Sequence, residues 1–128
     1  MPSILVCEPQ VDLEAAMLEY LVAAAFTVTL ERNGMRALGF LRRQVFDIVA
    51  VEMALASLDG LGVIRAYRAA GGCSPVIILT GRISTEELSR AIEAGATAHL
   101  EKPFLLTDLL LLLKSLLSKS IATNKLYY

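Results

Sequence analysis

The chain has 128 residues, a hydrophobic share of 55% and a formal net charge of −1 at pH 7. This length suits one domain, and the mean hydropathy of +0.59 predicts that most elements bury at least one face. The balanced charge argues against nucleic-acid binding, which usually needs a basic excess. No apolar run reaches the roughly 20 residues of a membrane helix, and the amino terminus does not resemble a secretion signal.

The cysteine content favours a reducing compartment. Cys7 and Cys73 are the only two cysteines. Because the chain has no recognisable export signal, these two distant thiols do not predict a disulfide framework. Cys7 ends an apolar run and is interpreted as a small buried hydrophobe. We therefore expect a cytoplasmic protein without membrane or nucleic-acid partners.

Five strand-like runs alternate with five helix-like segments. The first run is Ser3–Cys7, and Asp12 is predicted to cap a helix that ends near Ala25. Phe26–Glu31 is a second strand, and Asn33 with Gly34 starts a helix over Met35–Gln44.

The second half of the chain repeats this alternation. Phe46–Val51 and Val76–Leu79 are strands, separated by a helix that opens at Asp59 and Gly60 and ends before Gly71. Ser84 and Glu87 form a capping-box pattern for a helix that ends at Ala94. Ala96–Leu100 is a weak fifth strand, and a leucine-rich helix runs from Leu106 to about Lys119. We expect one domain over residues 1–119 and a tail or linker over residues 120–128.

Strand and helix alternate strictly, which predicts an α/β fold with a parallel sheet covered on both faces. Three runs are continuously apolar, as buried central strands should be: Ile4–Cys7, Ile48–Val51 and Val76–Leu79. The other two are mixed and belong at the edges. The resulting order is 2-1-3-4-5, a flavodoxin-like doubly wound (βα)5 sheet whose site lies at the carboxyl ends of strands 1 and 3.

Polar residues stand directly after four of the five predicted strands. They are Glu8, followed by Pro9, after the first, Glu52 after the third, Thr80 after the fourth and Lys102-Pro103 after the fifth. Because these strand ends meet at one edge of the sheet, two acids, a hydroxyl and a cation are expected to converge there.

Three stretches resemble receiver (CheY-like) domains of bacterial two-component response regulators, a likeness that covers Ser3 to about Lys119. The stretches are Asp47–Gly60, Pro75–Gly81 and Gly95–Phe104. The resemblance implies a phosphorelay signalling module rather than an enzyme, with a histidine kinase or an effector domain as partner. It assigns the switch positions to Thr80 and His99, and the phosphate-interacting lysine and cis proline to Lys102 and Pro103.

Two positions depart from the pattern of that family. The phosphoacceptor position holds Glu52 instead of Asp, and Pro9 replaces an acid that ligates Mg²⁺, alongside the acidic-pocket residue Glu8. The remaining metal positions are the Glu52 carboxylate and the Ala54 carbonyl, so Mg²⁺, which demands octahedral oxygen ligands, is expected to bind weakly or not at all. The extra methylene of Glu52 displaces its carboxylate by roughly 1–1.5 Å, and misplacement of about 1 Å can slow a reaction about 100-fold.

We therefore predict a receiver-type module that works without phosphorylation, through protein contacts and without a cofactor. Several alternatives stay open. Glu52 either mimics the phosphorylated state in part or simply pairs with Lys102, and His99 is either a rotamer switch or an ordinary edge-strand histidine. A conventional phospho-receiver with slow Mg²⁺-dependent self-phosphorylation is the second function class. A flavodoxin-like protein or enzyme is the third, although the loop after Cys7 lacks the glycines of a phosphate loop.

The last predicted helix carries more leucines than one buried face needs. Leu109, Leu113 and Leu116 form a sufficient core-facing stripe. Leu110 and Leu111, like Leu112 and Leu117, remain unexplained by that stripe. An uncovered apolar surface usually marks a contact site. The fourth helix, fifth strand and fifth helix resemble the face through which receiver domains form homodimers, so we predict such a homodimer with Leu110 and Leu111 at the interface. The alternative is a leucine-rich helix with scattered exposed side chains.

Overall fold

The computed structural model describes residues 1–127, with side-chain environments for residues 1–119. Five parallel strands form one sheet in the order β2-β1-β3-β4-β5, as predicted. The strands are β1 (Ser3–Cys7), β2 (Thr27–Glu31), β3 (Ile48–Glu52), β4 (Val76–Thr80) and β5 (Ala98–Glu101). The helices are α1 (Val11–Ala23), α2 (Gly34–Arg43), α3 (Gly60–Ala69), α4 (Thr85–Ala94) and α5 (Leu106–Tyr127).

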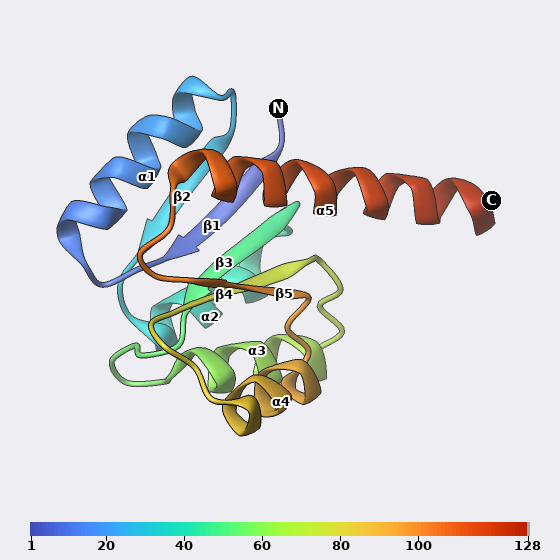
Figure 1. The fold of residues 1–128 in the computed structure, drawn as a ribbon. Helices are drawn as coiled ribbons and strands as arrows, with labels where there is room; N and C mark the ends of the chain where they lie inside the picture. The colour runs from blue at the N-terminus through green and yellow to red at the C-terminus, as the bar shows by residue number, and fades with distance from the viewer. Residues whose placement is uncertain (128) are drawn as a thin grey trace.

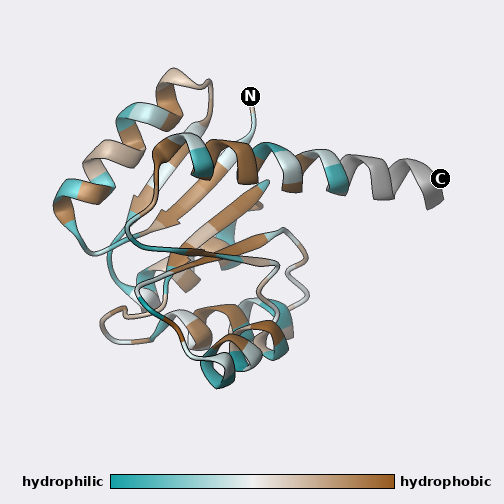
Figure 2. Cartoon of the chain, in the orientation of Figure 1, coloured by the Kyte–Doolittle hydropathy of each residue, from teal (hydrophilic) through white to brown (hydrophobic). Residues whose placement is uncertain are grey.

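The helices form two layers, one on each face of the sheet. Figure 1 shows α1 and α5 on one face and α2, α3 and α4 on the other. Successive residues of β1 point to opposite faces, so Ile4 packs against the α1–α5 layer and Leu5 against the α2–α3–α4 layer. The hydropathy colouring in Figure 2 shows the apolar central strands between these layers. The central strands are buried on both sides, which confirms the interpretation of their continuous apolar runs.

Three of the helix starts follow the sequence signals. Asn33 accepts a hydrogen bond from Arg36 N at the start of α2, and Asp59 accepts one from Gly62 N at the start of α3. Ser84 and Glu87 form the predicted capping box of α4. The prediction for Asp12 is wrong, because the cap position of α1 is Gln10, two residues earlier, and no side chain caps the helix. Asp12 instead lies in the first turn, where an acid favours the positive end of the helix dipole.

The last helix is longer than predicted. α5 continues to Tyr127, so the expected end near Lys119 is too early and residues 120–127 extend the helix; Tyr128 lies outside the described residues. Among the described residues, no helix combines the length and apolar character needed to cross a bilayer.

Candidate functional site

Lys102 lies between two carboxylates at the carboxyl ends of the central strands. Its Nζ atom is 2.6 Å from Oε1 of Glu8, which follows β1, and 3.0 Å from Oε1 of Glu52, which ends β3. The sequence places these three residues on one rim, and the structure brings them into direct contact.

Both carboxylates are also held at their second oxygen. Glu8 Oε2 accepts a hydrogen bond from Gln10 N at 3.0 Å, and Glu52 Oε2 accepts one from Met53 N at 2.6 Å. The Glu8 side chain is fully buried, and those of Glu52 and Lys102 are only 13% and 14% exposed. For Glu8 Oε1 the ion pair to Lys102 is the only close polar contact among the described residues. Because a buried charge is costly without a partner, the lysine and the two acids depend on one another.

The two carboxylates of this cluster change the pKa of Lys102. Burial lowers the pKa of Lys102, but the contacts with Glu8 and Glu52 outweigh that effect and raise the pKa above its usual value of 10.5. Lys102 is therefore charged at neutral pH and faces two acids.

Thr80 lies on the same rim but is joined to the cluster through its backbone. Its carbonyl oxygen accepts a hydrogen bond from Lys102 N at 2.7 Å, and the residue is buried. Among the described residues, its hydroxyl forms no hydrogen bond with the carboxylates or the ammonium group. The Lys102–Pro103 peptide bond is cis, as the resemblance implied.

His99 lies on β5 with an exposed side chain. It borders a cavity of about 150 Å³ between α4 and β5, together with Leu88 and Ile92. This position agrees with an edge-strand histidine, and a switching role for His99 remains a prediction.

The donor set at the rim fits Mg²⁺ poorly. Pro9 is exposed and supplies no side-chain oxygen, and each of the two carboxylates already contacts Lys102. Ala54 offers only its carbonyl. Within the part of the chain that the structure describes, no group of three or more acidic, histidine or cysteine side chains could hold a metal ion. Mg²⁺ is usually held by one or two carboxylates, with waters completing its octahedron, and here Lys102 occupies both carboxylates.

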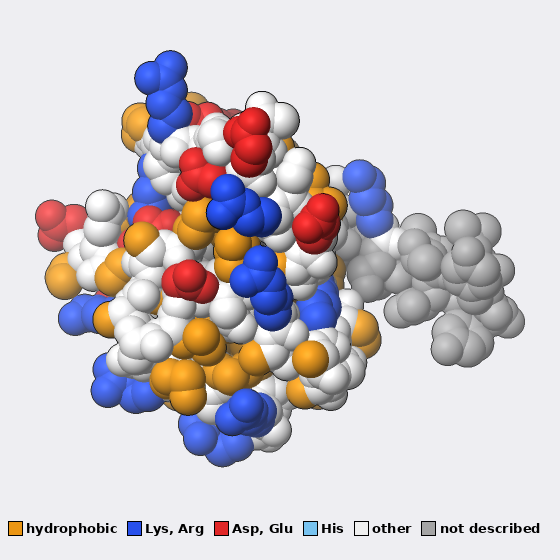
Figure 3. All heavy atoms as spheres, turned by 90° about the horizontal axis from the view of Figure 1, so that it is seen from below, with side chains coloured by type: hydrophobic (Ala, Val, Ile, Leu, Met, Phe, Trp, Pro, Cys, Tyr) orange, Lys and Arg blue, Asp and Glu red, His pale blue; other side chains and the backbone are white. Residues whose placement is uncertain are grey.

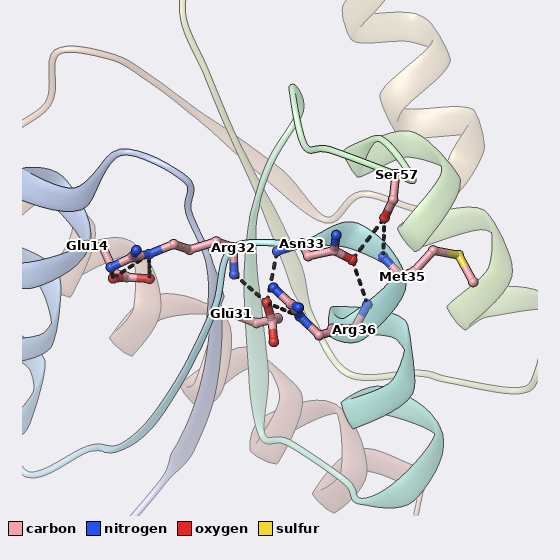
Figure 4. A network of polar contacts seen from close by, with 7 residues as sticks. All are labelled: Glu14, Glu31, Arg32, Asn33, Met35, Arg36 and Ser57. Atoms are coloured by element: carbon pink, nitrogen blue, oxygen red, sulfur yellow. Dashed lines mark hydrogen bonds and ion pairs between the residues drawn. The ribbon is translucent and has the colours of Figure 1, made fainter.

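A second polar network lies beside the site and was not predicted from the sequence (Figure 4). Glu14 on α1 is buried, and the Arg32 guanidinium binds both of its oxygens, with Nη2 2.7 Å from Oε1 and Nε 3.2 Å from Oε2. The sequence does contain a signal for this pair. Glu14 lies beside Leu13 on the core-facing side of its helix, and a buried acid needs a partner. The identity of that partner follows only from the fold.

The turn after β2 is also anchored to the loop that follows Glu52. Asn33 Oδ1 accepts a hydrogen bond from Ser57 Oγ at 2.9 Å, and Gly34 N donates one to Ala56 O at 3.0 Å (Figure 4 for the side chains). A Cβ atom at Gly34 would lie 1.7 Å from the carbonyl oxygen of Leu58. Only glycine therefore allows the two segments to approach this closely.

The leucines of α5 are divided differently from the prediction. Leu110 is half-buried and packs against the core, as do Leu112 and Leu117, so packing accounts for three of the leucines that the central stripe left unexplained. Leu111 is 68% exposed. The helix lies across the sheet closely enough for its flanks to reach the core as well as its central stripe.

Comparisons with known proteins agree with this architecture. The family pattern described as "Response regulator receiver domain" matches residues 4–114. The chain is 35% identical over 95 residues to the response regulator MprA of Mycobacterium sp. (strain KMS), which covers 74% of this chain and 41% of that protein. The chain thus spans less than half the length of the curated relatives that it matches.

Solved structures show the same fold. A CheY-like response regulator receiver domain protein from Methanospirillum hungatei JF-1 superposes with a TM-score of 0.91 at 20% identity, covering 96% of this chain and 98% of that one. The receiver domain of the sensor histidine kinase PA1611 from Pseudomonas aeruginosa PAO1, solved with a magnesium ion coordinated in its active site cleft, has a TM-score of 0.84 at 27% identity. It covers 91% of this chain and 98% of its own. With the family pattern, the strand order and the rim of strand-end residues in agreement, the chain belongs to the response regulator receiver domains of two-component signalling.

Proposed function

We propose that this receiver domain signals through protein contacts without a cycle of aspartyl-type phosphorylation. The observation that carries the proposal is the position of Lys102, whose ammonium group contacts both Glu8 and Glu52.

Phosphoryl transfer makes demands that this arrangement does not meet. The acceptor carboxylate must attack in line, and a divalent cation normally neutralises the charge that develops on the phosphoryl oxygens. Here one oxygen of Glu52 pairs with Lys102 and the other accepts a hydrogen bond from the backbone. A single ammonium charge occupies the place between the carboxylates, and Pro9 supplies no further ligand.

We further propose that Glu52 is a fixed ion partner rather than a mimic of a phosphorylated residue. Its two polar contacts, to Lys102 and to Met53 N, support this, as does the exposed side chain of His99. In a mimic, the Thr80 hydroxyl would be drawn towards the acid, and among the described residues no such hydrogen bond forms.

The protein contacts that we propose involve a second copy and a kinase or effector domain. Exposed apolar side chains occur on α4, before α5 and on α5: Ile92 is 62%, Leu105 is 67% and Leu111 is 68% exposed. Apolar side chains grouped on one surface favour association. We propose homodimerisation through the face formed by α4, β5 and α5, with Leu111 as its apolar contact.

The test compares the natural chain with the double variant Pro9→Asp, Glu52→Asp. Each protein is exposed to acetyl phosphate with Mg²⁺, and its intact mass is measured. We expect the natural chain to keep its mass and the double variant to gain one phosphoryl group. Beryllofluoride binding, followed by fluorine NMR, provides a second readout that needs no covalent step. Phosphoryl uptake by the natural chain in the presence of Mg²⁺ would overturn the proposal.

A further inference from the structure

The charged residues of three helices are segregated by sign. α2 and α3 together carry five arginines and no acidic residue, whereas α1 carries three acids and no lysine or arginine. The arginines are Arg36, Arg42 and Arg43 on α2 and Arg65 and Arg68 on α3; the acids are Asp12, Glu14 and Glu19.

Some of these charges are already neutralised within the chain. Arg36 pairs with Glu31, Glu14 pairs with Arg32, and the Arg68 guanidinium donates to the carbonyl oxygens of three loop residues. The remaining charges are exposed and form no ion pair among the described residues. They are Arg42, Arg43 and Arg65 on the α2–α3 layer and Asp12 and Glu19 on α1.

The two sets of free charges face away from each other. α1 lies on one face of the sheet and α2 and α3 lie on the opposite face (Figure 1). Figure 3 views the α2–α3–α4 layer from outside, and the lower third of that surface shows lysine or arginine beside hydrophobic side chains with no acid among the described residues. α5 shares a layer with α1 but carries Lys114 and Lys119 as well as Asp108, so of these two helices only α1 carries acids without bases among the residues whose side chains are described.

Apolar side chains accompany both charged surfaces. On α1, Val11 and Val22 are 56% and 54% exposed and stand beside Asp12 and Glu19. Leu18 lies between the two valines on the helix surface, and it is not among the residues that pack against the core.

The basic surface offers a hollow for such side chains. Val45, which follows α2, is 87% exposed. Together with Arg42 it borders a cavity of about 310 Å³ whose wall includes Leu41 and the ring of Tyr67. The cavity lies near the amino ends of β3 and β4, away from Lys102.

We propose that the acidic apolar surface of α1 in one copy of this chain docks on the basic α2–α3 surface of the next copy. Both partners of this interface are present on the chain with complementary charge, and the net charge of −1 leaves little overall repulsion between copies. The two surfaces differ and lie on opposite layers, so the contact is heterologous and adds further copies instead of closing as a two-fold dimer. It uses none of the α4–β5–α5 face.

The first test is sedimentation velocity of the full chain over a range of concentrations at two ionic strengths. At about 10 mM salt, where charges act over about 30 Å, we expect species larger than a dimer that grow with concentration. At about 1 M salt, where the screening length is about 3 Å, these species should disappear and leave the monomer or closed dimer. The absence of species larger than a dimer at low salt would overturn the proposal.

A charge swap tests the two surfaces directly. Asp12→Lys with Glu19→Lys makes both surfaces basic, and Arg42→Glu with Arg65→Glu makes both acidic. Each double variant alone should lose the large species, and an equimolar mixture should recover them, because each surface then meets an opposite charge. The matched control is Glu86→Lys with Glu93→Lys on α4, which changes the net charge as the first variant does but should keep the large species. The proposal would be overturned if the mixture did not recover the large species or if the control lost them. Circular dichroism verifies that each variant is folded.

Discussion

Lys102 and Glu8 form a 2.6 Å ion pair in which the carboxylate is fully buried, although the two residues lie far apart in the sequence. Glu52 completes the cluster from β3 at 3.0 Å. The contact joins the end of the fifth strand to the ends of the first and third. The same cluster therefore contributes to stability and determines which ions the rim can accept, and the predictions below separate these two roles.

Removing the lysine should destabilise the domain more than removing one acid. Lys102→Met leaves two carboxylates of like charge close together, one of them fully buried, so we expect a loss of about 3–5 kcal/mol in the free energy of unfolding. Glu8→Gln keeps the Lys102–Glu52 pair and should cost less. Urea titration followed by circular dichroism measures both; equal losses would show that the charges of the cluster are not coupled.

Removing the lysine should also open the rim to cations. In Lys102→Ala, the Glu8 and Glu52 carboxylates lose their ammonium partner, and a divalent cation can replace it. We expect Mg²⁺ or Ca²⁺ to raise the melting temperature of this variant and to leave that of the natural chain unchanged. Lys114→Ala, which removes an exposed lysine of α5, is the control. A cation-dependent shift of the same size in the natural chain would contradict this expectation.

The stabilising effect of Lys102 should disappear at alkaline pH. Its pKa is raised in the folded state, so the folded protein holds this proton more tightly than the unfolded chain, whose value is near 10.5. The contribution is fully present below that value and is lost as the pH rises through the higher folded pKa. The difference in unfolding free energy between the natural chain and Lys102→Met should therefore be constant from neutral pH to about pH 10 and shrink above it. A difference that stays constant through this alkaline range would mean that the lysine proton is not linked to folding.

Gly34 and Gly39, both on α2, should respond in opposite directions to the same substitution. A Cβ at Gly34 would lie 1.7 Å from the Leu58 carbonyl oxygen, so Gly34→Ala forces the turn after β2 away from the loop after Glu52. We expect a loss of about 1–3 kcal/mol, typical of overpacking. At Gly39 the nearest atom is 3.4 Å away, on the flexible Arg43 side chain. Gly39→Ala should be neutral or stabilise by up to about 1 kcal/mol through helix propensity. Thermal unfolding measures both effects. Similar effects at the two positions would show that the close approach of Gly34 to Leu58 does not contribute to stability.

Substitutions at two neighbouring leucines of α5 should distinguish an effect on association from an effect on folding stability. Leu111→Glu changes an exposed side chain and should give a folded monomer if the α4–β5–α5 face forms the dimer. Leu110→Glu places a charge on a half-buried side chain that packs against the core, so it should lower stability. Light scattering coupled to size exclusion reports the mass of each variant. A dimer that persists in Leu111→Glu excludes this face.

Local patterns in the chain were sufficient to predict the arrangement of the elements. Continuous apolar runs at Ile4–Cys7 and Val76–Leu79 identify buried central strands, since a parallel strand covered by helices on both faces has no polar side. The strand order follows, and the order places Glu8, Glu52 and Lys102 on one rim. The capping pattern of Ser84 and Glu87 was equally local, because both partners lie within one helical turn.

The partners within the site and the packing of α5 required the tertiary structure. Lys102 and Glu52 are 50 residues apart, and the pairing of one ammonium group with two carboxylates depends on a side-chain geometry that no periodicity encodes. The same holds for Glu14 and Arg32, and for Leu110, whose burial depends on how α5 lies across the sheet. Residue patterns report which face of an element is apolar, but distances between remote side chains arise only when the elements pack against one another.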